Sequence, residues 1–291
     1  MPHPGWSRFS FEGIGTHWEI STSSTLAPDV QRQLLGTVAD YDHTYSRFRP
    51  DSLVSALQRG PGSISLPGHS VALHDVYEAL YRLSGGSMTP LIGSSLNRLG
   101  YDAGYSLVPS GAPEGAAKWE DDVLEWSGTT VSGKVPLVLD IGAAGKGQLV
   151  DLLAEVLRST GYVDFLVDGS GDMLHAGSMP VTVALEHPYN PKQAIGTVEL
   201  DNSALCASAS NRRAWGDGLH HVLDGTTGQP IQTTVATWTM AASAMVADAL
   251  ATALFMVEPA ALEAEFDFSW LRVFSNGTAT FSAGFEGRLF T

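Results

Sequence analysis

The chain has 291 residues, of which 44% are hydrophobic and 16% are charged, so it can bury the core of one large globular domain and is not disordered. Its net charge of −15 disfavours nucleic acid as a partner, because the average field repels a phosphodiester backbone. The single cysteine, Cys206, excludes an intrachain disulfide and a cysteine-based zinc site. No apolar run reaches the roughly 20 residues that span a bilayer, and residues 1–11 lack a signal-peptide pattern. We therefore expect a cytoplasmic protein that is not integral to a membrane.

The first half of the chain predicts a mixture of short strands and amphipathic helices. Apolar residues recur at helical spacing in residues 29–45 and again in residues 71–83, which two glycines follow. The expected elements are a strand over 12–21, helices over 29–45 and 71–83, a loop over 60–68, and strands over 101–108, 119–126 and 135–141.

The second half continues the mixture without a strict strand-helix-strand repeat, so we expect an α+β layered fold rather than a doubly wound sheet. Asn276 and Gly277 separate two apolar runs and predict a closing hairpin. The expected elements are helices over 148–159 and 242–256, strands over 165–167, 181–186, 196–200 and 233–241, a loop or short strands over 215–230, and hairpin strands over 271–274 and 279–282.

A glycine-rich turn, residues 142–147, joins the predicted strand at 135–141 to the helix at 148–159. Such a turn aims several backbone N–H groups and a helix N-terminus at one point, and Lys146 adds a positive charge there. The turn could therefore hold a phosphate group, although it matches neither GxGxxG nor a P-loop. An ordinary turn without a ligand is the equal alternative.

Asp248 and Thr252 are four residues apart on the predicted helix at 242–256, so they share one face. A carboxylate and a hydroxyl are costly to bury unpaired on an apolar helix, whereas hard cations such as Mg²⁺ take oxygen ligands of this kind. The alternative is a surface position for Asp248 and an internally bonded Thr252.

Two further clusters are weak signals by themselves. His220 and His221 precede Asp224, and a histidine near a carboxylate can act as a general base at neutral pH. Ordinary loop histidines are the alternative. A polar and basic cluster, which could hold phosphate or face solvent, comprises Ser208, Ser210, Arg212 and Arg213.

These signals occur in an order that resembles the ApbE family of FAD:protein FMN transferases over about residues 13–255. The matching stretches are Gly15-Thr16, YSRFRPDS at 45–52, LDIGAAGKG at 139–147, DGSGD at 168–172, HVLD at 221–224 with TGQP at 227–230, and ADALAT at 247–252. The resemblance implies a single domain over 1–291, with a T-fold-type layered architecture and a flavin cleft between two halves. It also implies Mg²⁺-dependent, or other divalent-cation-dependent, transfer of FMN from FAD to a threonine of an acceptor protein, with release of AMP.

The resemblance assigns roles to individual residues. Asp248 and Thr252 would bind the metal, together with the backbone at Ala143 and Ala251, and His221 would be the base or would orient a phosphate. The residues that would contact FAD are Ile14, Phe48, Ser87, Met88, Thr89, Asp140, Lys146 and Val222.

The chain also departs from the family pattern. Phe48 stands where the family usually has tyrosine, Gly225 where it has proline, and the stretch MTPLIG at 88–93 lacks an aspartate and a threonine. These changes lie in the flavin pocket, so two alternatives to transfer stay open: a metal-dependent FAD pyrophosphatase and a non-catalytic flavin-binding protein. A serine hydrolase that uses Ser208 or Ser210 is disfavoured, because the chain has no GxSxG elbow.

Overall fold

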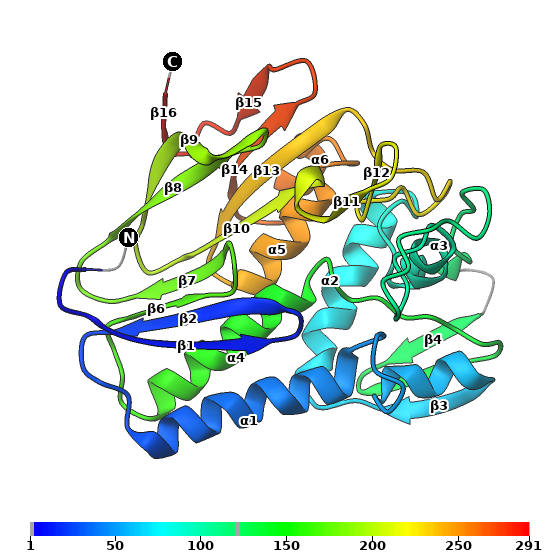
Figure 1. Cartoon of the computed structure of the whole chain (residues 1–291), viewed down its shortest axis with the longest axis horizontal. Helices are drawn as coiled ribbons and strands as arrows, with labels where there is room; N and C mark the ends of the chain where they lie inside the picture. The colour runs from blue at the N-terminus through cyan, green and yellow to red at the C-terminus, as the bar shows by residue number, and fades with distance from the viewer. Residues whose placement is uncertain (1–2, 120–122, 291) are drawn as a thin grey trace.

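The computed structural model describes residues 3–119 and 123–290, and its centre is an antiparallel sheet of eight strands (Figure 1). The strand order is β1-β2-β6-β7-β10-β13-β14-β15. The bounds are β1 (Ser7–Gly13), β2 (Thr16–Thr22), β6 (Phe165–Asp168), β7 (Asp172–Ala176), β10 (Ala204–Ala209), β13 (Thr234–Ala241), β14 (Ser269–Phe274) and β15 (Ala279–Phe281).

Helices cover one face of this sheet, and a small second sheet covers the other face (Figure 1). The helices are α1 (Pro28–Tyr45), α2 (Ser70–Leu83), α4 (Gly145–Ser159) and α5 (Ala244–Ala253). Of these, α2 packs against α5 rather than on the sheet itself. The second sheet consists of β8 (Val181–His187), β9 (Asn190–Leu200) and β16 (Arg288–Leu289). Neighbouring sheet residues alternate between the two cores: Val167 faces the helices, whereas Leu166 packs against the small sheet. The predicted α+β layered fold is therefore confirmed.

Shorter elements complete the described chain. A three-stranded sheet at one end contains β3 (Gly62–Ser65), β5 (Thr130–Gly133) and β4 (Leu124–Ser127), and a separate pair contains β11 (Ala214–Trp215) and β12 (Leu219–His220). The short helices are η1 (Val54–Arg59), η2 (Pro90–Ile92), α3 (Gly93–Arg98), η4 (Ser210–Arg213) and α6 (Pro259–Glu263). Within the described residues, no helix combines the length and the apolar character needed to cross a bilayer.

The strongly periodic helices were predicted to within a few residues, but four segments differ from expectation. The expected strand at 135–141 is extended but pairs with no neighbouring strand in the described residues. Its amides form single hydrogen bonds to other segments: the Leu137 amide donates to the Leu57 carbonyl, and the Asp140 amide donates to the Pro90 carbonyl. Residues 101–108 fold back as a loop, and the expected loop at 60–68 contains β3. The expected strand at 12–21 is split by a tight turn at Ile14 and Gly15, which have φ values of 45° and 77°. Of the expected strand at 119–126, residues 120–122 lie outside the described residues.

The position of α5 is fixed by α4 and β13. A Cβ atom on Gly147 of α4 would lie 2.1 Å from the carbonyl oxygen of Ala244, so only glycine permits this approach. On the other side, the hydroxyls of Thr237 and Thr239 on β13 donate to the carbonyls of Ala251 and Ala247, at 2.6 and 2.5 Å. The helix that carries Asp248 is therefore held on both sides.

Asp151 on α4 caps the N-terminus of α5. Its carboxylate accepts hydrogen bonds from the Ser243 hydroxyl (2.7 Å) and from the amides of Ala244 and Met245 (2.9 Å each). These amides have no partner within their own helix, and a carboxylate at a helix N-terminus also interacts favourably with the helix dipole.

We expect Asp151→Ala to lower the free energy of unfolding by about 2 kcal/mol, the upper range for losing a helix cap, because two buried amides lose their acceptor. Chemical denaturation followed by circular dichroism measures this change. Asp151→Asn keeps one acceptor oxygen and should lose less. An unchanged midpoint for Asp151→Ala would contradict the assigned capping role.

Candidate functional site

A pocket of about 780 Å³ opens between the glycine-rich turn at 142–147, α5 and the segments that follow β10. We call it the main pocket. Every residue predicted for the site lines it except Ala251: Ile14, Phe48, Ser87, Met88, Thr89, Asp140, Ala143, Lys146, His221, Val222, Asp248 and Thr252. The structure therefore brings these distant segments together at one cavity.

The floor of the main pocket is a buried cluster of two carboxylates and one ammonium. Asp248 is only 4% exposed, and its Oδ2 accepts a hydrogen bond from the Gly147 amide at 2.9 Å. Lys146 Nζ lies 3.1 Å from Oδ2 of Asp172, which is fully buried. Burial raises the pKa of Asp248 well above its ordinary value, and the nearby Asp172 raises it further. One ammonium group therefore faces two carboxyl groups at this floor.

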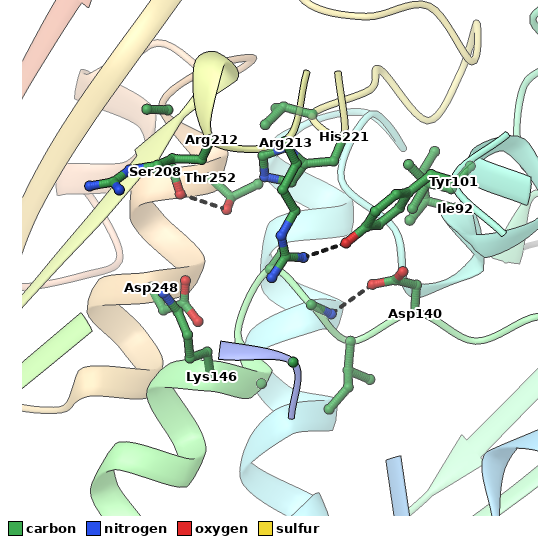
Figure 2. Close-up of a pocket in the computed structure, with 18 of the residues that line it drawn as sticks. Ile92, Tyr101, Asp140, Lys146, Ser208, Arg212, Arg213, His221, Asp248 and Thr252 are labelled. Atoms are coloured by element: carbon green, nitrogen blue, oxygen red, sulfur yellow. Dashed lines mark hydrogen bonds between the residues drawn. The ribbon is translucent and has the colours of Figure 1, made fainter. Parts of the chain in front are cut away.

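Thr252 lies one turn along α5 from Asp248, and both side chains face the pocket (Figure 2). Its hydroxyl is 3.2 Å from that of Ser208 on β10, within hydrogen-bonding distance. Ala143 also lines the pocket, whereas the carbonyl of Ala251 points to Thr237 and accepts its hydrogen bond. Within residues 3–119 and 123–290 no group of three or more His, Cys, Asp or Glu side chains could hold a metal ion. A cation here would need hydroxyl and carbonyl oxygens as well as Asp248.

The opposite wall is organised by an ion pair between Arg47 and Asp140, whose Nε and Oδ2 atoms are 2.5 Å apart. The buried guanidinium of Arg47 also donates to Asn97 Oδ1 (2.7 Å) and to the Tyr101 carbonyl (2.9 Å). Asp140 Oδ1 accepts from the Gly142 amide at 2.7 Å. Burial raises the pKa of Asp140, but Arg47 and the Gly142 amide outweigh it and hold the pKa below its usual value. Asp140 thus stays ionised and shapes the glycine-rich turn.

Sequence reasoning did not identify Arg47 as a site residue. Its position in the YSRFRPDS stretch gives no sign that the guanidinium is buried, because its partners Asp140 and Tyr101 are 93 and 54 residues away. Asp172 stands out in the sequence only as the last residue of the DGSGD stretch, yet its carboxylate holds Lys146.

His221 and Arg213 occupy the third side of the pocket (Figure 2). Burial, and then the positive charge of Arg213, lower the pKa of His221 to about 3, so its imidazole is neutral at pH 7. Arg213 Nη1 donates to the hydroxyl of Tyr101 at 2.8 Å, and its guanidinium points into the cavity.

The two serines weighed as hydrolase nucleophiles have other partners. Ser208 lies beside Thr252, and the Ser210 hydroxyl donates to the Val235 carbonyl at 3.4 Å. Neither forms a hydrogen bond to His221 in the part of the chain that the structure describes, and the arrangement does not support a serine hydrolase.

The departure at Gly225 has a structural counterpart in the pocket wall. The Gly225 amide donates to the Ser87 carbonyl at 2.8 Å, a bond that proline could not form. A Cβ atom on Gly225 would also lie 2.7 Å from the methyl carbon of Thr89. This contact places residues 87–89 against the loop that carries His221.

Comparison with known proteins places this geometry in a family. The sequence model of the ApbE family matches residues 14–267. The FAD:protein FMN transferase of Vibrio cholerae serotype O1 is 30% identical over 255 residues, which cover 82% of this chain and 75% of that protein. The FAD:protein FMN transferase of Salmonella typhimurium is 26% identical over 270 residues, 84% of this chain and 76% of that protein.

Solved structures agree in fold. The flavin transferase ApbE from Vibrio cholerae superposes with a TM-score of 0.78 at 21% identity, covering 96% of this chain and 98% of that one. The ApbE protein from Thermotoga maritima superposes with a TM-score of 0.82 at 20% identity, covering 97% and 99%. Since the family match spans most of the sequence and includes all the pocket segments named above, this chain belongs to the ApbE family.

Proposed function

We propose that this protein is an FAD:protein FMN transferase that moves the FMN half of FAD to a threonine hydroxyl of an acceptor protein. The hydroxyl oxygen bonds to the phosphorus on the FMN side, the bond from that phosphorus to the bridging oxygen breaks, and AMP leaves with that oxygen. Membership of the family and the names of the relatives support the reaction. The observation that carries it is the pair Asp248 and Thr252 at the floor of a pocket with the volume of a cofactor site.

Mg²⁺ would be held by Asp248, Thr252 and the backbone of Ala143, hard oxygen ligands of the kind that this ion prefers. The residues fit a cation because, within the described residues, the buried Asp248 carboxylate accepts a hydrogen bond from the uncharged Gly147 amide alone, while Lys146 is paired with Asp172. When bound, the ion would offset negative charge on the diphosphate and on the leaving AMP. Ala251 is the least supported of the predicted ligands, since its carbonyl already accepts from Thr237.

Lys146 and Arg213 would bind the diphosphate from two sides of the pocket. Each cation is restrained by a partner, Lys146 by Asp172 and Arg213 by the Tyr101 hydroxyl. Charges that are already in position stabilise a developing phosphate charge without reorganising during the reaction. Asp140 would act on FAD through the glycine-rich turn that it orients.

His221 would accept the proton of the attacking hydroxyl. Its imidazole is neutral, as a base must be before the reaction, and a bound diphosphate that offsets Arg213 would raise its basicity. Because the pocket draws on residues from Ile14 to Met256, we propose that the chain acts as one domain over 1–291. A cytoplasmic location stays a prediction.

The test is incubation of the protein with FAD and Mg²⁺, with and without lysate proteins as acceptors, followed by measurement of AMP, free FMN and protein-bound FMN. AMP together with protein-bound FMN is expected. AMP with free FMN alone would replace the proposal by a metal-dependent FAD pyrophosphatase, in which water takes the place of threonine. FAD binding without AMP under every condition would identify a flavin-binding protein.

We expect Asp248→Asn to slow AMP release on the order of a hundredfold or more, because the change removes the charged metal ligand but keeps the side-chain shape. Chromatographic assay of AMP, with EDTA in parallel, measures the effect. Asp267→Asn, an exposed change outside the pocket, is the matched control and should behave as wild type. A wild-type rate for Asp248→Asn would exclude the assigned metal site.

We expect His221→Asn to lower kcat/KM by about 10²–10⁴-fold, the usual contribution of a positioned base. Since the pKa of His221 is lowered to about 3, the histidine stays neutral as pH falls from 8 to 5, and both profiles should have the same shape. The exposed change His43→Asn is the control. An acid limb near the ordinary histidine pKa, present in wild type and absent in His221→Asn, would contradict this assignment.

A further inference from the structure

The ring of Phe48 lines the main pocket but is already packed against two neighbours. The guanidinium carbon of Arg47 lies 4.1 Å from its centre, and the ring of Tyr105 stacks on it with a centroid distance of 5.2 Å and an interplanar angle of 9°. Tyr101 meets both rings edge-on, at 5.5 and 5.6 Å. Arg47 is fixed by three hydrogen bonds and Tyr101 is buried, whereas Tyr105 is half exposed.

Tyr105 is presented by a loop with an unusual backbone. Tyr105 and Leu107 have φ values of 48° and 52°, in the left-handed region that non-glycine residues seldom adopt. The carboxylate of Asp102 stabilises this form, because it accepts hydrogen bonds from the amides of Gly104 (2.9 Å) and Ser106 (3.1 Å). The Ser106 hydroxyl donates to the same carboxylate at 2.5 Å. Backbone strain that a local network compensates is typical of ligand clamps.

The Tyr105 side chain reaches across the mouth of the main pocket. Its hydroxyl is 3.9 Å from the point where a Cβ atom on Gly15 would lie, in the turn between β1 and β2. Tyr105, Gly15 and Ile14 all line the pocket, and Tyr105 is 51% exposed. The loop that carries Tyr105 and the turn between β1 and β2 thus both border the pocket, and the tyrosine side chain extends from the first toward the second.

We propose that Tyr105 is a specificity-determining residue that stacks on a planar ring system of bound FAD at the mouth of the pocket, with Phe48 as the ring behind it. The proposal rests on the proposed function, and assigns the stacking surface to Tyr105 rather than to Phe48. A tyrosine ring offers a large flat contact area, and a loop that already holds it in place reduces the entropy lost on binding. The isoalloxazine and the adenine are both planar, and the test distinguishes them.

The test is equilibrium titration of the wild type, Tyr105→Asn and Tyr105→Phe with FAD, FMN and ADP, with Mg²⁺ and again with EDTA. Asparagine suits the left-handed backbone, so Tyr105→Asn removes the ring without disturbing the loop. We expect roughly tenfold weaker FAD binding for Tyr105→Asn, as for loss of one stacked base, and near wild-type binding for Tyr105→Phe. Weaker FMN binding with unchanged ADP binding would assign the isoalloxazine to Tyr105, and the reverse would assign the adenine.

Two further variants distinguish the effect of losing the Tyr105 ring from the effect of changing its loop or its neighbour Phe48. Val108→Asn, at a 68% exposed position of the same loop that does not line the pocket, should bind FAD as the wild type does. Phe48→Leu should lose less affinity than Tyr105→Asn. Equal FAD affinity of Tyr105→Asn and the wild type would overturn the proposal, and so would tighter binding, since the ring would then obstruct the mouth. Absence of FAD binding by the wild type itself would remove the proposed function together with this one.

Discussion

The close approach of α4 and α5 at Gly147 is the contact on which the rest of the site depends. No side chain larger than hydrogen fits between Gly147 and the Ala244 carbonyl, and the same approach brings the Gly147 amide to the Asp248 carboxylate. Since α4 also begins with the glycine-rich turn, one helix pair sets the distance between this turn and the proposed metal ligands. Asp151 strengthens the pair, because it lies on α4 and caps α5.

Charge is distributed unevenly around the pocket of this strongly acidic protein. Its cations are held where they face the cavity: Lys146 against Asp172, and Arg213 against Tyr101. Arg47, by contrast, is neutralised by Asp140 and has a structural role. A diphosphate would meet two available cations and a floor that can accept a third, although the average field of a chain with net charge −15 opposes anions. Local placement of a few charges therefore decides the ligand more than the overall charge does.

The sequence predicted what depends on local pattern and missed what depends on distant partners. The helices at 29–45 and 71–83 repeat apolar residues strongly enough to be located directly, and the order of the motifs predicted which segments meet at the pocket. The segment at 135–141 is apolar like a buried strand, but its hydrogen bonds go to η1 and η2. Arg47 and Tyr105 escaped notice because burial and stacking arise only when residues far apart in the chain are brought together.

Two features of the main pocket are unfavourable by themselves, in a fold whose other parts agree with their sequence. Burial and the nearby Asp172 raise the pKa of Asp248, while Tyr105 and Leu107 adopt a backbone that suits glycine. A protein whose core is otherwise consistent tolerates such conflicts mainly where function requires them. A divalent cation would stabilise the ionised Asp248 carboxylate. A ligand ring stacked on Tyr105 would explain why the loop keeps its strained backbone. Both conflicts lie in the lining of the same pocket, where one bound molecule would act on each of them.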